Sequence, residues 1–189
     1  MRHKYPTQAL VLARTPIAEA SALLTLLTRD VGLVRARAQG VRMPGAKLAA
    51  SLPTFAESGV VLVAGKDGWR VSGAVLENNW FTQLSRAARV RAARVSTLLL
   101  RLVHGESPDP EIFEIFLAYL AALASRAENE HDALETLAAL NILSALGLDA
   151  GELPGKVGDA FSTEAIAAAL SERTAYITRI NRGIEASGL

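Results

Sequence analysis

The spacing of apolar residues changes near residue 80, and this change limits the chain to a small set of folds. Before that point, short apolar runs alternate with glycine- and proline-containing turns, a pattern typical of β-strands. After it, apolar residues recur at three- and four-residue intervals over long segments, as in amphipathic helices. We therefore predict an α+β protein with a β-barrel domain at residues 1–79 and an all-α helical domain at residues 80–189.

Five strands are predicted in the first 79 residues, at 7–14, 22–28, 33–41, 54–64 and 69–76. A turn at residues 29–32 joins the second strand to the third, and Gly32 there is free to adopt a positive φ. A short helical turn at 47–52 precedes the fourth strand, and Lys66-Asp67-Gly68 is a hairpin signal. Three strands, a helical connection and two strands are the order of an OB-fold, a barrel that commonly binds oligonucleotides. Small SH3-like barrels give a similar pattern.

The third predicted strand alternates small apolar residues with polar ones. A period of two places the two sets on opposite faces of the strand. The apolar set is Val34, Ala36 and Ala38, and the polar set is Arg35, Arg37 and Gln39. We therefore expect the two arginines to point away from the barrel interior.

Four helices are predicted after residue 80, at 81–104, 109–125, 132–146 and from 162 or 163 to about 186. The second begins at Asp109-Pro110-Glu111, because Asp caps a helix, Pro fits the first helical position and Glu complements the positive end. Ser162 or Thr163 caps the last helix. Gly147 ends the third.

The net charge of +1 hides an uneven distribution. Residues 1–105 contain 15 Lys and Arg against 5 Asp and Glu, whereas residues 106–189 contain 5 against 14, which gives +10 and −9. Such asymmetry favours an anionic partner for the basic part. Attraction between the two parts across an internal interface is the alternative.

The segment 28–48 carries five basic residues and one acidic residue, and no acidic residue lies between 31 and 56. One arginine guanidinium can bind two phosphate oxygens at once. Neutralising phosphates also releases the counterions of the nucleic acid, and this release drives binding whatever the nucleotide sequence. A solubilising strand face is the other interpretation. The candidate DNA-binding residues are Arg14, Arg29, Arg35, Arg37, Arg42 and Lys47.

A second basic run lies on the first predicted helix, opposite its apolar stripe. We interpret this face as an extension of the DNA path, as a site for an acidic peptide, or as a solvated surface. Its members are Arg86, Arg89, Arg94 and Arg101. Arg91 falls nearer the apolar side and is predicted to anchor two helices or two domains, with its stem buried and its head paired.

Aromatic platforms for base stacking, which single-strand binders usually offer, are absent from the segment 28–48. Trp69 and Phe55 lie nearby in the sequence, but we assign them to the barrel core. The sequence therefore predicts contact with the nucleic-acid backbone and little sequence preference.

Motifs for catalysis, cofactor binding or metal binding are absent from the sequence, so we expect no enzyme and no cofactor. Without cysteine, and with three scattered histidines, no structural metal is expected. The run of Glu128, Glu130, His131 and Asp132 is interpreted as a solvated loop that leads into a helix. No apolar stretch approaches the about 20 residues of a membrane span, and we expect a cytoplasmic protein.

Residues 9–55, ALVLARTPIAEASALLTLLTRDVGLVRARAQGVRMPGAKLAASLPTF, resemble the N-terminal domain of the RecO family of recombination mediators. The shared pattern begins with an ALVL strand and an acidic residue, Glu19, before the second strand. A T-x-x-x-G turn follows at residues 28–32, then a basic A-x-G element at 38–40 and an L-x-P-F-like element at 52–55. Residues 98–123, LLLRLVHGESPDPEIFEIFLAYLAAL, resemble the helical domain of the family.

The resemblance implies an OB-fold followed by helices, and binding of single- and double-stranded DNA. It also implies partnership with RecR, contact with the acidic C-terminal tail of single-stranded-DNA-binding protein, strand annealing, and indirect action on the RecA recombinase. Two features depart from the family pattern. Gln39 stands where a lysine is usual, and the four-cysteine zinc module of some members is absent, since the chain has no cysteine.

The leading hypothesis from sequence is a non-enzymatic DNA-binding mediator of recombinational repair. A small scaffold protein whose basic surface binds an acidic protein partner is one alternative. An RNA-binding OB module is another, because it uses the same kind of basic face. Steep salt dependence of binding to random single-stranded DNA favours the first hypothesis over the second.

Overall fold

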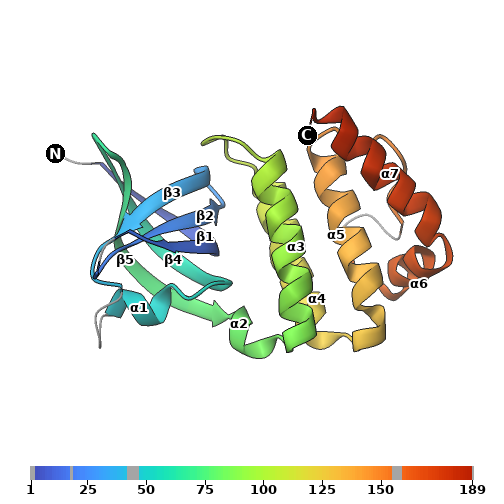
Figure 1. The fold of residues 1–189 in the computed structure, drawn as a ribbon, viewed down its shortest axis with the longest axis horizontal. Helices are drawn as coiled ribbons and strands as arrows, with labels where there is room; N and C mark the ends of the chain where they lie inside the picture. The colour runs from blue at the N-terminus through green and yellow to red at the C-terminus, as the bar shows by residue number, and fades with distance from the viewer. Residues whose placement is uncertain (1–2, 18, 42–46, 155–158, 189) are drawn as a thin grey trace. The chain divides into compact units, whose positions relative to one another are not determined.

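The computed structural model describes residues 3–17, 19–41, 47–154 and 159–188. Their contacts divide the chain into two compact units, residues 1–83 with 104–113, and residues 84–103 with 114–189. Among the described residues, the first unit holds all the strands and the second holds most of the helices, which confirms the predicted α+β class with the barrel first (Figure 1). The expected domain boundary after residue 79 stays a prediction.

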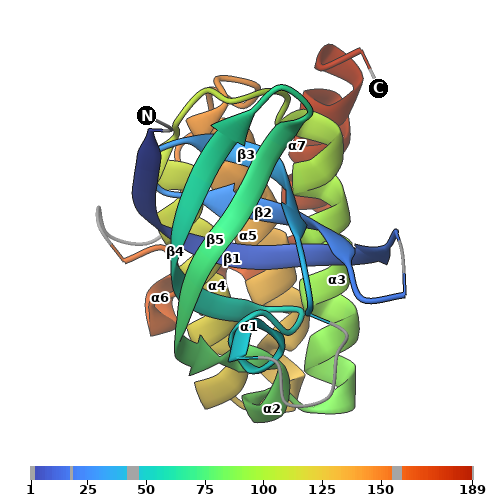
Figure 2. The ribbon, with the colours of Figure 1, turned by 90° about the vertical axis from the view of Figure 1, so that its left-hand side faces the viewer.

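Five strands form a closed barrel in the order β1-β2-β3-β5-β4, with β4 pairing back to β1. All pairs are antiparallel except β3 with β5, and this order is that of an OB-fold. The strands are β1 (Lys4–Pro16), β2 (Ala22–Thr28), β3 (Gly32–Ala38), β4 (Ala56–Gly65) and β5 (Gly68–Asn79). In Figure 2 the β4–β5 hairpin runs across β1, β2 and β3. The five predicted strands are thus confirmed, with shifted ends.

The barrel interior is filled by small and branched aliphatic side chains from every strand. A five-stranded barrel is narrow, so alanine and valine are needed wherever opposite walls meet. The short helix α1 (Lys47–Ser51) lies between β3 and β4 in the chain, at the predicted position, and packs against β5. The buried members of the interior include Ala9, Val11, Leu24, Leu26, Val34, Ala36, Leu52, Val60, Leu62 and Val71.

Residues 104–113 lie far along the chain but contact the first unit, which we call the barrel unit. We call the second unit the helical unit. Gly32, in the turn between β2 and β3, adopts a φ of +88°, as predicted, and its Cα lies against the backbone of Ser107. The Trp69 indole N–H donates to Glu106 Oε1 over 2.6 Å. Residues 104–113 therefore belong to the first unit, although residues of the second unit precede and follow them in the chain.

Besides α1, the α-helices of the described residues are α2 (Trp80–Gln83), α3 (Arg86–Leu102), α4 (Pro110–Ser125), α5 (His131–Ala145), α6 (Thr163–Ser171) and α7 (Arg173–Ala186). Two predicted helices prove to be divided. Ser85 caps α3 by accepting from the Ala88 N–H, so the helix predicted from residue 81 breaks into α2 and α3. The last predicted helix breaks at Glu172. Ser162 caps α6 through the Ala165 N–H, as predicted.

The helix α5 is the centre of the second unit, where it packs against α3, α6 and α7 (Figure 1). It is buried nearly all round, which a helix of alanine and leucine tolerates because few polar groups must be satisfied. The Asp109 side chain accepts from the Ile112 N–H over 3.1 Å, which confirms it as the cap of α4. No helix in the described part of the chain is long and apolar enough to cross a membrane.

Candidate nucleic-acid interface

The outer face of β3 presents two arginines. Arg35 and Arg37 are exposed, whereas Val34, Ala36 and Ala38 between and beside them are almost completely buried. The predicted alternation is confirmed. At a rise of about 3.3 Å per residue, the two arginine Cα atoms lie about 7 Å apart.

The residues of β2 that stand opposite the two arginines do not neutralise their charge. Arg35 stands opposite Thr25 of β2, and Arg37 stands opposite Leu23. Among the described residues neither arginine forms an ion pair. Both guanidinium groups are thus left to interact with solvent or with an anionic ligand.

Two other candidates lie apart from this face. Arg14 of β1 stands opposite Leu24, whose side chain is completely buried, so Arg14 lies on the core-facing side of the sheet and is half-buried. Arg29 is exposed in the turn at the far end of β3 from Arg37, and its guanidinium donates to Gln8 Oε1 over 3.2 Å. The structure therefore groups Arg35 with Arg37 and separates Arg14 from them.

The remaining candidates of this segment fall at the edge of what the structure describes. Arg42 lies outside the described residues. Lys47 begins α1, and its side chain is also outside the described part of the chain. Their roles in DNA binding stay predictions.

A hollow of about 600 Å³ lies beside the β4–β5 hairpin. It is bounded by Arg37 and Gln39 from the end of β3, by the hairpin residues 63–68, and by Trp69 and Arg70. Sequence reasoning missed Arg70 and Lys66 as candidate ligands of an anion. The signal was hidden because β3 and β5 are far apart in the sequence and meet only through the parallel pairing that closes the barrel.

Trp69 lies at the edge of the core rather than inside it. Its side chain is half-buried, packs against the barrel interior, and stands edge-to-face with Tyr5 at 5.2 Å between ring centroids. Its N–H is already held by Glu106. Phe55, by contrast, is buried, but it is not one of the residues that fill the barrel interior. The assignment of Trp69 to the core is therefore only partly right.

The predicted arginine face of α3 is divided by the structure. Arg86, Arg94 and Arg101 are exposed, and Arg89 is half-buried. Arg94 contacts Glu135 of α5 over 3.4 Å, although 62% of its side chain remains exposed. Arg94 is thus already directed to a carboxylate of the same unit.

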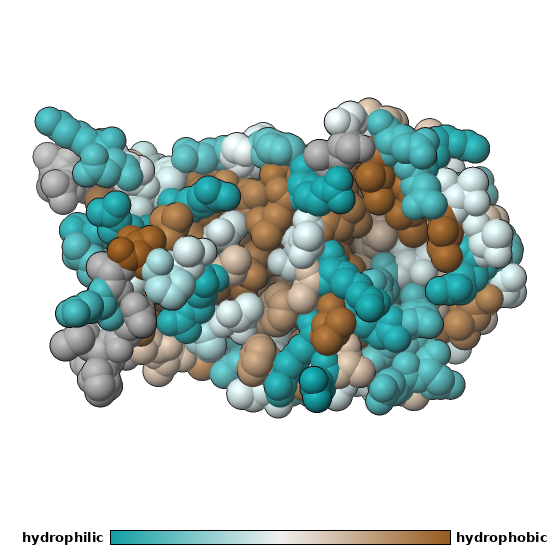
Figure 3. Space-filling model, viewed as in Figure 1, coloured by the Kyte–Doolittle hydropathy of each residue, from teal (hydrophilic) through white to brown (hydrophobic). Residues whose placement is uncertain are grey.

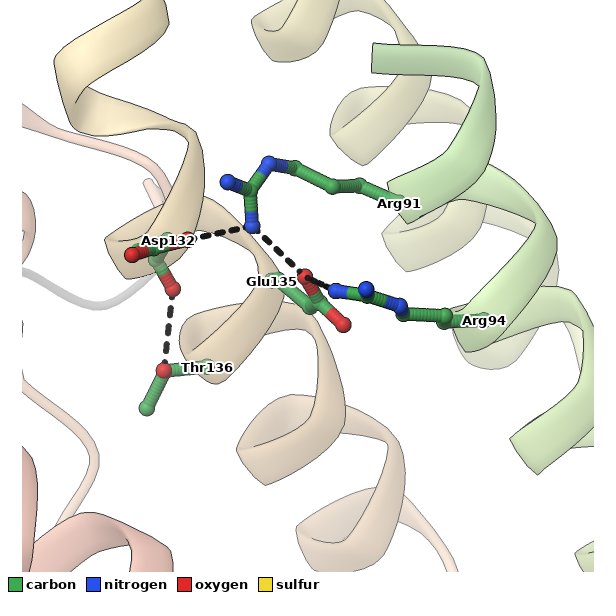
Figure 4. Close-up of polar contacts among 5 residues, drawn as sticks. All are labelled: Arg91, Arg94, Asp132, Glu135 and Thr136. Carbon is green, nitrogen blue, oxygen red and sulfur yellow. Dashed lines mark hydrogen bonds and ion pairs between the residues drawn. The ribbon is translucent and has the colours of Figure 1, made fainter. Parts of the chain in front are cut away.

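Arg91 joins α3 to α5, which confirms its predicted role as a paired anchor (Figure 4). Its guanidinium contacts Asp132 and lies 3.0 Å from Glu135, and 22% of its side chain is exposed. Burial by itself lowers the pKa of Arg91, but hydrogen bonds and charge from Glu135 and Asp132 outweigh burial and raise it. Arg91 is therefore a fixed cation of the helical unit.

A second hollow of about 310 Å³ lies among α3, α5 and α7. Figure 3 looks onto this side, where apolar and hydrophilic side chains border the hollow. Apolar residues from all three helices line it, and both basic and acidic groups stand at its rim. The apolar members are Val95, Leu98, Ala139, Ile177 and Ile180, and the charged members are Arg91, Arg94, Arg173, Asp132 and Glu135.

The histidine considered as a metal ligand is part of the helical packing. His131 is buried, and its Nε2 lies 3.2 Å from the Arg126 carbonyl oxygen. The Glu130 carboxylate accepts from the Ala127 N–H over 3.1 Å. Within the described ranges, no group of three or more potential ligand side chains is placed to hold a metal ion.

The strand order, the helical connection after β3 and the following helices define an α+β protein with an OB-type barrel. Comparison with known sequences narrows this fold class to a protein family. Residues 1–78 match the family model described as Recombination protein O N terminal. This part of the chain is therefore a RecO N-terminal domain, and the chain is homologous to the DNA repair protein RecO.

Similarity to individual relatives extends into the helical part. The DNA repair protein RecO of Synechococcus elongatus is 35% identical over 114 residues, which are 60% of this chain and 43% of the relative. The DNA repair protein RecO of Dehalococcoides mccartyi is 32% identical over 113 residues, 59% of this chain and 45% of the relative. The match thus spans less than half the length of these relatives.

Proposed function

We propose that this chain is a non-enzymatic DNA-binding mediator of recombinational repair, which binds and anneals single-stranded DNA and helps to load a recombinase. The observation that carries the proposal is the outward arginine pair of β3, Arg35 and Arg37, on a barrel of RecO N-terminal type. Homology to DNA repair protein RecO supports DNA as the anionic partner. The lack of carboxylates next to the pair supports contact with phosphates.

The site contacts the backbone rather than the bases. Arginines bind phosphate oxygens without reading sequence, and counterion release makes this binding strongly dependent on salt. Trp69 supports the same mode, because its N–H donates to Glu106 and its ring already stands edge-to-face with Tyr5. A protein that holds backbones leaves bases free to pair, which is what annealing requires.

We predict that Arg35→Gln with Arg37→Gln weakens binding to random single-stranded DNA by roughly tenfold to a hundredfold at low salt. The slope of log affinity against log salt should fall by about 0.7 for each lost phosphate contact. Fluorescence anisotropy of a labelled oligonucleotide at several salt concentrations measures both quantities. The control is Arg182→Gln, the loss of an exposed arginine on α7 of the other unit.

The outcomes separate the candidate functions. Unchanged affinity and slope in a folded double variant would remove the β3 face from consideration. Tight binding of structured RNA with weak binding of DNA would favour the RNA-binding module. If neither nucleic acid binds and only acidic proteins do, the scaffold function takes its place.

We further propose that the second hollow receives the acidic C-terminal tail of single-stranded-DNA-binding protein, and that the chain works together with RecR. An acidic peptide that ends in an apolar residue needs cations around an apolar floor. Arg94 and Arg173 stand at the rim of the hollow, and Leu98, Ile177 and Ile180 line it. The acidic Asp132 is already in contact with Arg91 and so opposes the peptide less.

We predict that Arg94→Glu with Arg173→Glu lowers affinity for a labelled tail peptide by more than tenfold, while binding of a short single-stranded oligonucleotide changes little. Each reversal replaces attraction by repulsion at the rim. The matched control is Arg86→Glu with Arg101→Glu, which makes the same charge change on exposed positions of α3 outside the hollow. Isothermal calorimetry measures the peptide, and anisotropy measures the DNA.

The control also tests the competing role of α3. If Arg86→Glu with Arg101→Glu reduces DNA affinity strongly, these arginines extend the DNA path from the barrel. If the rim variant still binds the peptide, the tail site lies elsewhere.

A further inference from the structure

The barrel register places one residue from each of four strands in a single row. Arg37 of β3 pairs with Arg70 of β5, and Arg70 pairs with Val63 of β4. Val63 in turn pairs with Lys4 of β1. Directly opposed residues on neighbouring strands point to the same face, and Arg37 points outward. The outer surface at this end of the barrel thus carries a cross-strand row of Arg37, Arg70, Val63 and Lys4.

The two arginines of this row are an uncompensated pair of like charges. Neighbouring strands lie about 4.8 Å apart, so the two side chains leave the sheet side by side. Like charges in directly opposed positions destabilise a sheet. Among the described residues neither Arg37 nor Arg70 pairs with a carboxylate, and Asp67, which also borders the hollow, forms no ion pair with them. A bound anion would supply the missing charge.

The hollow beside the hairpin has the size for such a ligand. It measures about 600 Å³, within the usual range of about 300–1,000 Å³ for ligand sites. Arg37 and Arg70 border it, Gln39 adds an amide, and Lys66 is exposed at the hairpin tip. Val63, only 5% exposed, contributes an apolar part of the wall. The basic and amide groups suit a phosphate, and the apolar wall suits the sugar attached to it.

We infer that Arg37 and Arg70 form a phosphodiester clamp in this hollow, at which a nucleic-acid backbone that follows β3 turns across β5 toward Lys4. The inference rests on the proposed function, because it takes Arg35 and Arg37 as the start of the path. It adds Arg70 and Lys4 as ligands. Two adjacent guanidinium groups hold one phosphate through several hydrogen bonds, which a single arginine on a flat strand does not offer.

The test is Arg70→Gln in the full chain, with a labelled thymidine homo-oligonucleotide as the probe. Affinity at low salt should fall roughly fivefold to tenfold, and the salt slope should fall by about 0.7. Arg70→Lys keeps the charge but loses the fork, so it should fall between Arg70→Gln and the unaltered protein. Arg182→Gln, with the same loss of one charge, should bind like the unaltered protein.

A second measurement separates a clamp from a structural role. Because Arg70 faces Arg37 without a carboxylate, Arg70→Gln should leave the melting temperature of the free protein unchanged or higher. The melting-temperature increase that the oligonucleotide produces should shrink in the same variant. A lower melting temperature in the free protein with unchanged DNA affinity would overturn the clamp.

Different experimental results would contradict the clamp and the proposed DNA-binding function. If Arg35→Gln weakens binding while Arg70→Gln retains full affinity and slope, the clamp is wrong and the DNA-binding function stands. If the unaltered protein shows no salt-dependent binding to DNA, both are wrong.

Discussion

Gly32→Ala is expected to lower the free energy of unfolding of the barrel by about 2–5 kcal/mol, from two separate penalties. A residue with a Cβ in the left-handed region costs about 1–2 kcal/mol, and Gly32 has a φ of +88°. Its added Cβ would also lie 2.4 Å from the Ser107 carbonyl oxygen, a backbone atom that no rotamer change moves. Overpacking of this kind adds a further penalty of about 1–3 kcal/mol.

Gly68→Ala is the matched control, because Gly68 has a φ of +93° but no atom within 4 Å of the place that an added Cβ would take. It should show the conformational penalty alone, about 1–2 kcal/mol. Chemical denaturation followed by tryptophan fluorescence suits the comparison, since Trp69 and Trp80 both belong to the barrel unit. Equal losses in the two variants would show that residues 104–109 shift away without cost.

Gly32→Ala should also affect DNA binding. The turn that contains Gly32 begins β3, whose outer face carries Arg35 and Arg37. Displacing Ser107 also strains the neighbouring contact between Trp69 and Glu106. We therefore expect Gly32→Ala to weaken DNA binding in proportion to the loss of folded barrel.

Arg179→Met is expected to destabilise the helical unit by about 2–4 kcal/mol, because it leaves a nearly buried carboxylate without its partner. The guanidinium donates from Nε to Asp149 Oδ1 over 3.2 Å and from a terminal nitrogen to Asp149 Oδ2 over 2.5 Å. It also donates to the Glu152 carbonyl oxygen over 2.9 Å. Only 9% of the Asp149 side chain is exposed, so water compensates little for the loss.

The pKa of Arg179 supports a strong pair. The hydrogen bond with Asp149 is the largest cause that raises this pKa above its ordinary value, against the opposing effect of burial. Arg179 is therefore charged at neutral pH.

Two further variants test the Arg179 prediction. Arg182→Met removes an exposed arginine from the same helix and should change stability by less than about 0.5 kcal/mol. Arg179→Met combined with Asp149→Leu removes both charges, and it should be more stable than Arg179→Met alone. Circular dichroism at helical wavelengths during denaturation measures the effect. If Arg179→Met and Arg182→Met are alike, the pair contributes nothing.

Local chemistry allowed several features to be predicted from sequence. The alternation in β3 depends only on the period of a strand, so the outward direction of Arg35 and Arg37 followed from it. Asp109 and Ser162 were recognisable as helix caps because their partners lie three residues ahead. The helix breaks at Ser85 and Glu172 were missed, because the apolar spacing continues across both positions.

The candidate site was only partly predictable. Arg14 belongs to the same basic half of the sequence as Arg37, but the register of β1 with β2 places it opposite buried Leu24. A bulge in β1 between Val11 and Ala13 sets that register, and no residue pattern near these positions predicts the bulge. The arginine face of α3 was seen as a unit, yet Arg94 turns to Glu135, whose position depends on helix packing.

The order of strands and helices, the small side chains of the barrel interior and the arginines of β3 could all be read from the chain before it folds. These features depend on residues close together in sequence, where periodicity and turn chemistry act directly. Which cations become neighbours depends instead on the folded barrel. The parallel pairing of β3 with β5 brings Arg70 beside Arg37 across 33 positions of sequence, and the return of residues 104–113 brings Glu106 to Trp69. Such contacts form because burying the barrel interior and closing its edges outweighs the entropy of closing long loops, a balance that belongs to the whole fold.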